Sequence, residues 1–154
     1  MIDNNRRWMD LALAEARQAA REDEIPVGAV VVKNGRLLGR GHNRSRALSD
    51  PTAHAEILAI TAACQAEGSD HLEGADIYVT LEPCAMCAGA IVLARLARLY
   101  FGAHDPKTGA CGSVFDVVRE PRLNHSAEVY PGIRADEAQR MLDEFFEKLR
   151  DLDD

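Results

Sequence analysis

The segment Asp76–Gly102, which reads DIYVTLEPCAMCAGAIVLARLARLYFG, decides the fold expected for this chain. Apolar runs predict a strand over Asp76–Leu81 and another over Leu96–Gly102, and the stretch between them predicts a helix over Cys84–Arg95. A strand, a helix and a second strand at this spacing form a βαβ unit, which implies a parallel strand pair and a right-handed crossover. The segment therefore predicts an α/β protein.

The sequence before this unit predicts a helix, a hairpin and a second helix. Apolar residues at helical spacing favour a helix over Asn5–Arg21. The valine-rich run Val27–Lys33 stops at Asn34-Gly35, a dipeptide that favours a tight hairpin turn because both positions tolerate positive φ. Asp50-Pro51-Thr52 then precede a helix expected over His54–Glu67.

The sequence after the unit predicts a long loop over Ala103–Ser113, a weaker strand over Ala127–Tyr130 and a final helix from Ala135 to about Arg150. The acidic residues after Arg150 are expected to form a frayed tail. These elements predict a single domain over residues 1–154. Its fold class is α/β, with a three-layer α/β/α architecture and a mixed central sheet of about five strands covered by helices on both faces.

The composition of the 154 residues excludes several classes of protein. The chain is 47% hydrophobic and 28% charged, which is typical of a globular protein. Its apolar runs are far shorter than the ~20 residues of a membrane helix, and the N-terminus lacks the apolar core of an export signal. We therefore expect a cytoplasmic protein with no membrane partner. The net charge of −7 disfavours non-specific nucleic-acid coating, so we expect no DNA partner, but it leaves room for RNA recognition by a local basic patch.

Two short motifs carry the candidate chemistry. His54 and Glu56 open one predicted helix, and Pro83, Cys84 and Cys87 open another. Thiolates and imidazoles are ligands that Zn²⁺ prefers, and a catalytic zinc site has three protein ligands and one position left for water. We therefore expect His54, Cys84 and Cys87 to hold one zinc ion. Glu56 is then expected to stay unligated and to carry the proton between water and substrate.

Other kinds of site also contain two cysteines with two residues between them, including structural zinc sites and redox pairs. A structural zinc site needs four ligands, but the sequence has no second Cys-x-x-Cys and no His-x-x-x-His. Cys64 and Cys111 are isolated, and we expect both to be small buried residues. The two motifs together therefore favour zinc catalysis.

The pattern His54-x-Glu56 with Pro83-Cys84-x-x-Cys87 is the zinc-deaminase signature. Further stretches resemble the bacterial TadA-type tRNA adenosine deaminases: Ile25–Val30, Pro51–Ile57, Leu81–Ala90, Asp105–Ser113 and Leu123–His125. The resemblance runs from about Arg7 to Arg150. It implies a cytidine deaminase-like fold and hydrolytic deamination of the wobble adenosine in a tRNA anticodon stem-loop to inosine. It also implies a homodimer with one zinc ion per subunit.

The resemblance implies four residues that face the flipped base. Asn43 and Asn124 resemble polar contacts in the base pocket, Val27 resembles part of its apolar wall, and backbone amides near Ala55 would orient the base. A turn-forming role for Asn43 remains an alternative, because the chain changes direction after Gly41-His42.

Three more residues resemble contacts to the RNA around the base. Asp105 and Lys107 lie where the family touches flanking nucleotides, although a solvated pairing between the two is an alternative. Phe146 is similar to an aromatic residue that packs against the loop RNA. It lies beside the apolar stripe of the last helix, which favours an exposed ring over a core position.

Two features of the sequence depart from the family pattern. His104 stands where the family often has arginine, and the C-terminus is acidic; both weaken phosphate binding. Two other functions therefore remain open. One is deamination of a free nucleobase or nucleoside of the guanine or cytosine type. The other is a non-catalytic zinc-binding RNA module, which would not need Glu56.

Overall fold

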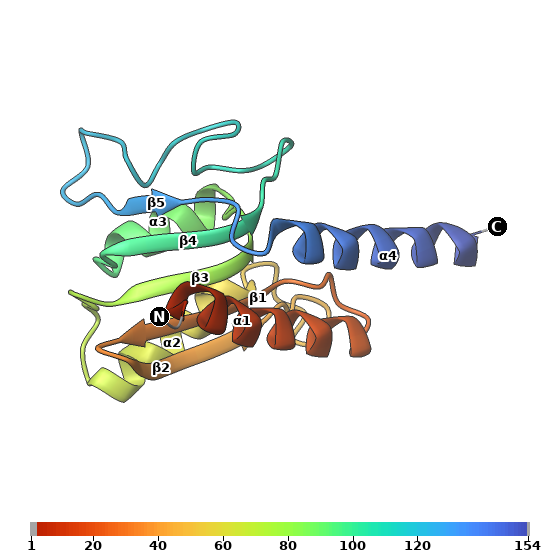
Figure 1. Ribbon diagram of the computed structural model, residues 1–154, viewed down its shortest axis with the longest axis horizontal. Coiled ribbons are helices and arrows are strands. Elements are labelled where there is room, and N and C mark those ends of the chain that lie inside the picture. The colour runs from red at the N-terminus through yellow and green to blue at the C-terminus, as the bar shows by residue number, and fades with distance from the viewer. Residues whose placement is uncertain (1–2, 154) are drawn as a thin grey trace.

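Five strands form one mixed sheet in the order β2-β1-β3-β4-β5 (Figure 1). The computed structural model describes residues 3–153. The strands are β1 (Gly28–Lys33), β2 (Arg36–His42), β3 (Asp76–Leu81), β4 (Arg98–Ala103) and β5 (Glu128–Tyr130). β1 is antiparallel to both β2 and β3, whereas β4 is parallel to both β3 and β5. The mixed sheet and the parallel pair predicted from the βαβ segment are confirmed.

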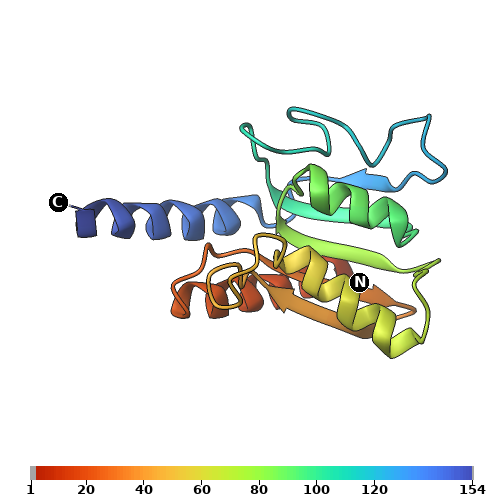
Figure 2. The ribbon, with the colours of Figure 1, turned by 180° about the vertical axis from the view of Figure 1, so that it is seen from behind.

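Two helices cover each face of this sheet (Figures 1 and 2). They are α1 (Asn4–Arg21), α2 (Ala55–Glu67), α3 (Ala85–Leu93) and α4 (Ala135–Asp153). Successive side chains of a strand point to opposite faces of the sheet, so alternate residues pack into two separate hydrophobic cores. Val31 and Ile77 join the core under α2 and α3, while Val30 and Tyr78 join the core under α1. The three-layer α/β/α prediction is confirmed.

Three element boundaries differ from the sequence predictions by more than one residue. The α3 helix ends at Leu93 rather than at Arg95, because Arg95 adopts a left-handed φ of 59° that stops the helix. The following strand, β4, therefore begins at Arg98 rather than at Leu96. The expectation of a frayed tail after Arg150 is wrong, since α4 continues to Asp153 with no glycine or proline to end it.

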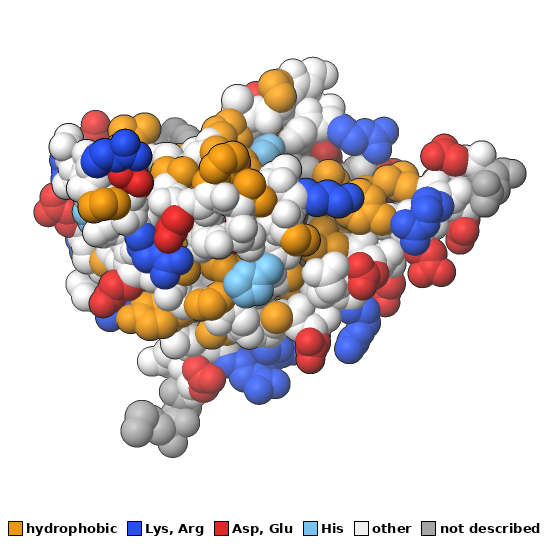
Figure 3. Space-filling model, turned by 90° about the horizontal axis from the view of Figure 1, so that it is seen from above, with side chains coloured by type: hydrophobic (Ala, Val, Ile, Leu, Met, Phe, Trp, Pro, Cys, Tyr) orange, Lys and Arg blue, Asp and Glu red, His pale blue; other side chains and the backbone are white. Residues whose placement is uncertain are grey.

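The far half of α4 stands clear of the sheet (Figures 1 and 3). Only Ala138 and Leu142 are buried in this helix, and Leu152 near its end is 82% exposed. Of the four helices in the described part of the chain, none is both long and apolar enough to cross a membrane.

Close contact between β1 and α1 depends on Gly28, and we expect Gly28→Ala to destabilise the protein. An added Cβ would lie 2.0 Å from the carbonyl oxygen of Ala12 and 2.5 Å from the backbone nitrogen of Ala16, both rigid helix atoms. The expected loss in the free energy of unfolding is about 3 kcal/mol, measured by urea denaturation. Gly89→Ala is the matched control. Its Cβ meets nothing within 4 Å and it lies in α3, so it should stabilise the protein slightly. A Gly28→Ala variant as stable as the wild type would contradict this packing.

Candidate metal centre and active site

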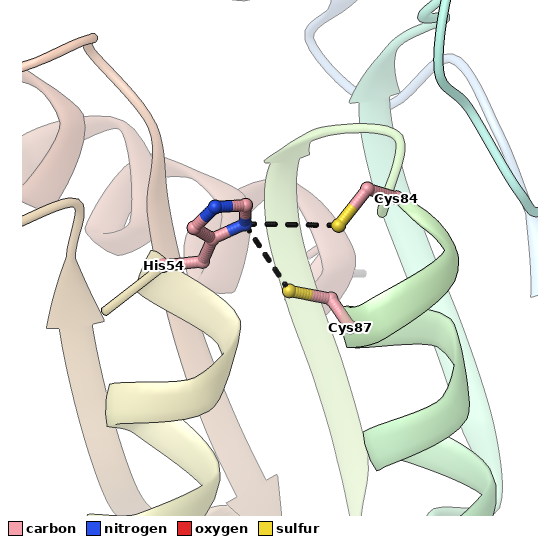
Figure 4. A group of neighbouring side chains, drawn as sticks. All are labelled: His54, Cys84 and Cys87. Atoms are coloured by element: carbon pink, nitrogen blue, oxygen red, sulfur yellow. Dashed lines mark hydrogen bonds between the residues drawn. The ribbon is translucent and has the colours of Figure 1, made fainter. Parts of the chain in front are cut away.

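Three side chains converge where the N-termini of α2 and α3 meet (Figure 4). The Nδ1 atom of His54 lies 3.7 Å from the Sγ atom of Cys84 and 3.5 Å from the Sγ atom of Cys87. A tetrahedral zinc ion with bonds of ~2.3 Å to sulfur and ~2.0 Å to nitrogen separates those atoms by about 3.5 Å. The geometry of the three donors therefore fits a zinc ion.

The helix starts make the donors available. His54 is the N-cap of α2 and Cys84 is the N-cap of α3, yet neither side chain makes the capping hydrogen bond usual at such positions. Cys87 lies in the first turn of α3 and is fully buried. Helix N-termini carry partial positive charge, which favours thiolates there. Pro83 directly precedes the cap, where a missing N–H costs nothing.

The pKa shifts of the three donors are linked, because each donor hydrogen-bonds to another member of the group. Hydrogen bonds with Cys87 and His54 lower the pKa of the Cys84 thiol to about 4. The hydrogen bond to Cys84, reinforced by burial, raises the pKa of the Cys87 thiol, and the hydrogen bond to Cys84 also raises the pKa of His54. One thiolate thus holds the protons of its two neighbours. A divalent cation that displaces those protons would find all three ligands already in position.

Glu56 lies in the first turn of α2 and is 4% exposed. Burial raises the pKa of its carboxyl group to about 7. Within residues 3–153, the His, Cys, Asp and Glu side chains form one group of three or more whose ligand atoms all lie within 4.8 Å of one another. This group consists of His54, Cys84 and Cys87 and does not include Glu56. A carboxyl group beside a metal site that is not a ligand, with a pKa near neutrality, suits proton transfer.

A pocket of about 160 Å³ opens beside these residues. It is smaller than the ~300–1,000 Å³ typical of sites for drug-sized ligands, so it suits one small group such as a single ring system. It is lined by Ile25, Val27, Asn43, Ser45, His54, Ala55, Glu56, Leu81, Glu82, Cys84, Asp105 and Thr108. The structure therefore brings together, around one space, seven of the residues that the sequence singled out.

Asn43 is held in a defined orientation at the pocket. Its side chain is 8% exposed, and its Oδ1 atom accepts a hydrogen bond of 2.8 Å from the hydroxyl group of Ser45. The donor that Asn43 can offer to a ligand is therefore its Nδ2 amide group. Ser45 was not predicted from the sequence, since a serine in a polar loop carries no signal of this role.

Asp105 serves its own loop as well as the pocket. Its carboxylate accepts hydrogen bonds from the backbone N–H groups of Lys107 and Thr108 and from the hydroxyl group of Thr108, at 2.8–3.1 Å. Among the ion pairs found in residues 3–153, there is none between the side chains of Asp105 and Lys107. The solvated pairing considered from the sequence is therefore wrong.

Four predicted site residues lie outside the lining of the pocket, and one of them, Cys87, belongs to the donor group described above. Lys107 is exposed on the loop beyond Asp105, and Asn124 is exposed on the segment before β5. The expectation that Asn124 reaches the pocket is not met within one chain, because β5 begins at the opposite end of the sheet from the end of β3. Phe146 is 41% exposed on α4, edge-on to Phe145, in agreement with the exposed ring expected for it.

The remaining cysteines differ from each other. Cys111 is 2% exposed, as expected for a small core residue, whereas Cys64 is only partly buried. Neither belongs to the group around His54.

Comparison with known proteins places this architecture in a family. The model of the MafB19-like deaminase family matches residues 3–150. The tRNA-specific adenosine deaminase of Agrobacterium fabrum is 52% identical over 147 residues, covering 96% of each chain. A solved structure from a study of A-to-I editing by tRNA:A34 deaminases at the wobble position has a TM-score of 0.85 at 51% identity, covering 88% of this chain and 99% of that one. The guanine deaminase from Nitrosomonas europaea has a TM-score of 0.76 at 27% identity, over 91% of this chain and 83% of its own.

Proposed function

This chain belongs to the tRNA-specific adenosine deaminases, within the family matched by the MafB19-like deaminase model, and from this premise we propose that it converts the wobble adenosine of a tRNA to inosine. The reaction adds one water to adenosine and releases ammonia. The observation that carries the proposal is the group of His54, Cys84 and Cys87 beside the buried, unligated Glu56 and a base-sized pocket. A zinc-binding module without catalysis would not need that carboxyl group.

The three donors would hold one zinc ion per subunit, with His54 binding through Nδ1 and both cysteines as thiolates. When bound, zinc supplies a Lewis acid that makes water nucleophilic near neutral pH. Two thiolates and one neutral imidazole balance the charge of the ion. Glu56 does not belong to the donor group, which supports an open coordination position on the zinc ion.

Glu56 would move the proton. Its carboxylate accepts a proton from the attacking water and delivers it to a nitrogen of the purine ring. It then accepts the second proton from the hydroxyl group added to the ring carbon and delivers it to the amino group, which leaves as ammonia while the carbonyl group forms. A carboxyl group with a pKa near 7 can both accept and release a proton at neutral pH, which supports this role. Its burial at 4% exposure also keeps bulk water from competing for that proton.

The pocket would hold the adenine after the base has left the stack of the anticodon loop. Val27 supplies an apolar wall, and backbone amides near Ala55 orient the ring. The Nδ2 amide of Asn43, oriented by Ser45, donates to a ring nitrogen. Asp105 borders the same space and contacts the nucleotide next to the target.

Residues outside the pocket would bind the rest of the anticodon stem-loop. Lys107, Asn124 and Phe146 are exposed and can meet flanking nucleotides, with Phe146 available for stacking. The protein would act as a homodimer in the cytoplasm. Exposed apolar side chains, including Leu93 at 78% at the end of α3 and Phe115 at 58% in the loop after β4, support an interface between subunits.

The decisive test incubates the zinc-loaded protein with an anticodon stem-loop RNA that has adenosine at the wobble position. We expect inosine at that position alone, read as A-to-G changes by sequencing of the RNA, together with an equal amount of ammonia. Guanine, cytosine and adenosine as free compounds are the comparison substrates. Ammonia released from them and none from the RNA would replace this proposal with a free-base deaminase.

Stacking by Phe146 predicts a loss of RNA affinity on Phe146→Ala. One stacked base contributes about 1–3 kcal/mol to binding, so the KM for the stem-loop should rise about tenfold while kcat changes little. Leu152→Ala is the matched control, because it removes an apolar side chain that is 82% exposed on the same helix. Steady-state kinetics distinguish the two. An equal KM for Phe146→Ala and the wild type would remove Phe146 from the RNA surface.

A further inference from the structure

Two carboxylates that the proposed reaction does not use are buried in or next to the pocket: Glu82 lines it, and Glu24 directly precedes the lining residue Ile25. Glu24 is 1% exposed and Glu82 is 2% exposed. A buried carboxylate is costly unless it is fully hydrogen-bonded. Each of these two carboxylates accepts hydrogen bonds mainly from the backbone of one loop, and residues of both loops line the pocket.

Glu82 holds the loop of residues 104–113 at both of its ends. Its Oε1 atom accepts from the backbone N–H of Asp105 at 3.0 Å. Its Oε2 atom accepts from the backbone N–H groups of Cys111 at 3.1 Å and Ser113 at 3.0 Å, and the Ser113 hydroxyl donates to Oε1. The loop also lies directly on this carboxylate, since a Cβ on Gly109 would be 2.4 Å from its carboxyl carbon. Thr108 and Asp105 line the pocket from this loop.

Glu24 holds the opposite loop, residues 43–53, in the same way. Its carboxylate accepts from the backbone N–H groups of Arg46 at 3.1 Å and Ala47 at 2.8 Å. The guanidinium group of Arg46 donates in turn to the carbonyl oxygen of Asp23 at 2.9 Å. This loop carries Asn43 into the pocket and leads directly to His54.

Hydrogen bonds from N–H groups to a buried carboxylate are stronger than neutral ones, and they cost much to break. They therefore restrict the backbone at Asp105 itself in one loop, and at Arg46 and Ala47, three and four residues after Asn43, in the other. Correct placement of a reacting group within about 1 Å can change a rate by about 10²-fold. The two carboxylates thus lie where a small shift of either loop would matter.

We propose that Glu24 and Glu82 are positioning residues for the proposed deamination, each holding one wall of the base pocket through the backbone of one loop. Glu82 sets the position of Asp105, and Glu24 sets the position of Asn43. The inference rests on the proposed function, because it assigns the two walls to the substrate base.

Crossed double-mutant cycles test this assignment with zinc-loaded protein and the anticodon stem-loop RNA as substrate. We expect Glu82→Gln to lower kcat/KM about 10- to 100-fold, because the amide replaces an acceptor with a donor that faces N–H groups. In an Asp105→Ala background the same change should cost less than about threefold, whereas in an Asn43→Ala background it should keep its full effect. Glu24→Gln should show the reverse pattern: it should cost less than about threefold in the Asn43→Ala background and keep its full effect in the Asp105→Ala background.

Control variants separate positioning from general instability. Glu67→Gln removes a carboxylate that pairs with Lys33 and Arg36 at the surface, and it should leave kcat/KM within about twofold. Ser113→Ala removes one donor to Glu82 and leaves the carboxylate, so it serves if Glu82→Gln does not fold. It should lower kcat/KM several-fold with the same dependence on Asp105. Zinc content and melting temperature are measured for every variant.

The proposal would be overturned if the effects were additive within the two pairs, Glu82 with Asp105 and Glu24 with Asn43. It would also be overturned if each glutamate coupled equally to Asp105 and to Asn43. Both patterns describe a general loss of structure. A wild-type protein that forms no inosine in the RNA would instead overturn the proposed function. The two failures are therefore distinguishable.

Discussion

Glu56→Gln is expected to lower kcat for inosine formation by about 10³-fold or more, while zinc content and melting temperature stay at wild-type values. The glutamine has the shape of the protonated glutamic acid but cannot accept a proton from water, and general acid–base catalysis of this kind contributes about 10²- to 10⁴-fold. The side chain is buried at 4% exposure and lies outside the group of metal donors, so the substitution removes no ligand. Single-turnover kinetics with stem-loop RNA, alongside metal analysis, measure both quantities.

Glu67→Gln is the control for this prediction, because it makes the same chemical change on the same helix at the surface. It should keep the wild-type kcat. A Glu56→Gln variant that turned over at near the wild-type rate would assign the proton transfer to another group. Loss of zinc in that variant would instead show that the carboxylate is a ligand.

Cys87→Ala is expected to abolish both zinc binding and activity. Cys87 is fully buried, and its Sγ atom lies 3.5 Å from the Nδ1 atom of His54, so the substitution removes one of the three donors from the centre of the group. Zinc content should fall from about one ion per chain to less than about 0.1, and inosine formation should fall at least about 10³-fold. Metal analysis of the purified protein and the stem-loop assay measure these losses.

Cys64→Ala is the matched control for the cysteine prediction. Cys64 lies in α2, only partly buried and outside the donor group. Its removal should change neither the zinc content nor the rate. Retention of one zinc ion by Cys87→Ala would refute the proposed ligand set.

Periodicity alone predicted the helices and strands of this fold within a few residues. Apolar runs separated by Asn34-Gly35 and by the Pro83-Cys84 helix start are local signals, because hydrophobic pattern and turn chemistry act over a few neighbouring residues. The order of the strands was not predictable in this way. β1 pairs with both β2 and β3, and the second of these pairings joins segments more than 40 residues apart.

The metal donors were predictable because their types and spacing are specific to one chemistry. The buried carboxylates Glu24 and Glu82 were not, since an isolated glutamate in a sequence is expected at the surface. Only the converging backbone N–H groups in the folded chain reveal why they are buried. The absence of Asn124 from the pocket has the same kind of cause, because it depends on the direction of β5 in the sheet.

The sequence by itself predicted the α/β fold class, the grouping of His54, Cys84 and Cys87, and a place for Glu56 outside that group. Cys84 and Cys87 are placed together by the geometry of one helical turn, whereas His54 was predicted from its residue type and motif and meets them only because the starts of α2 and α3 come together in the fold. Only the tertiary structure decided which imidazole nitrogen faces the sulfur atoms, how large the pocket is and which loops border it. Those features arise from packing between segments far apart in the chain, where a shift of a few ångströms in one element moves every side chain that it carries.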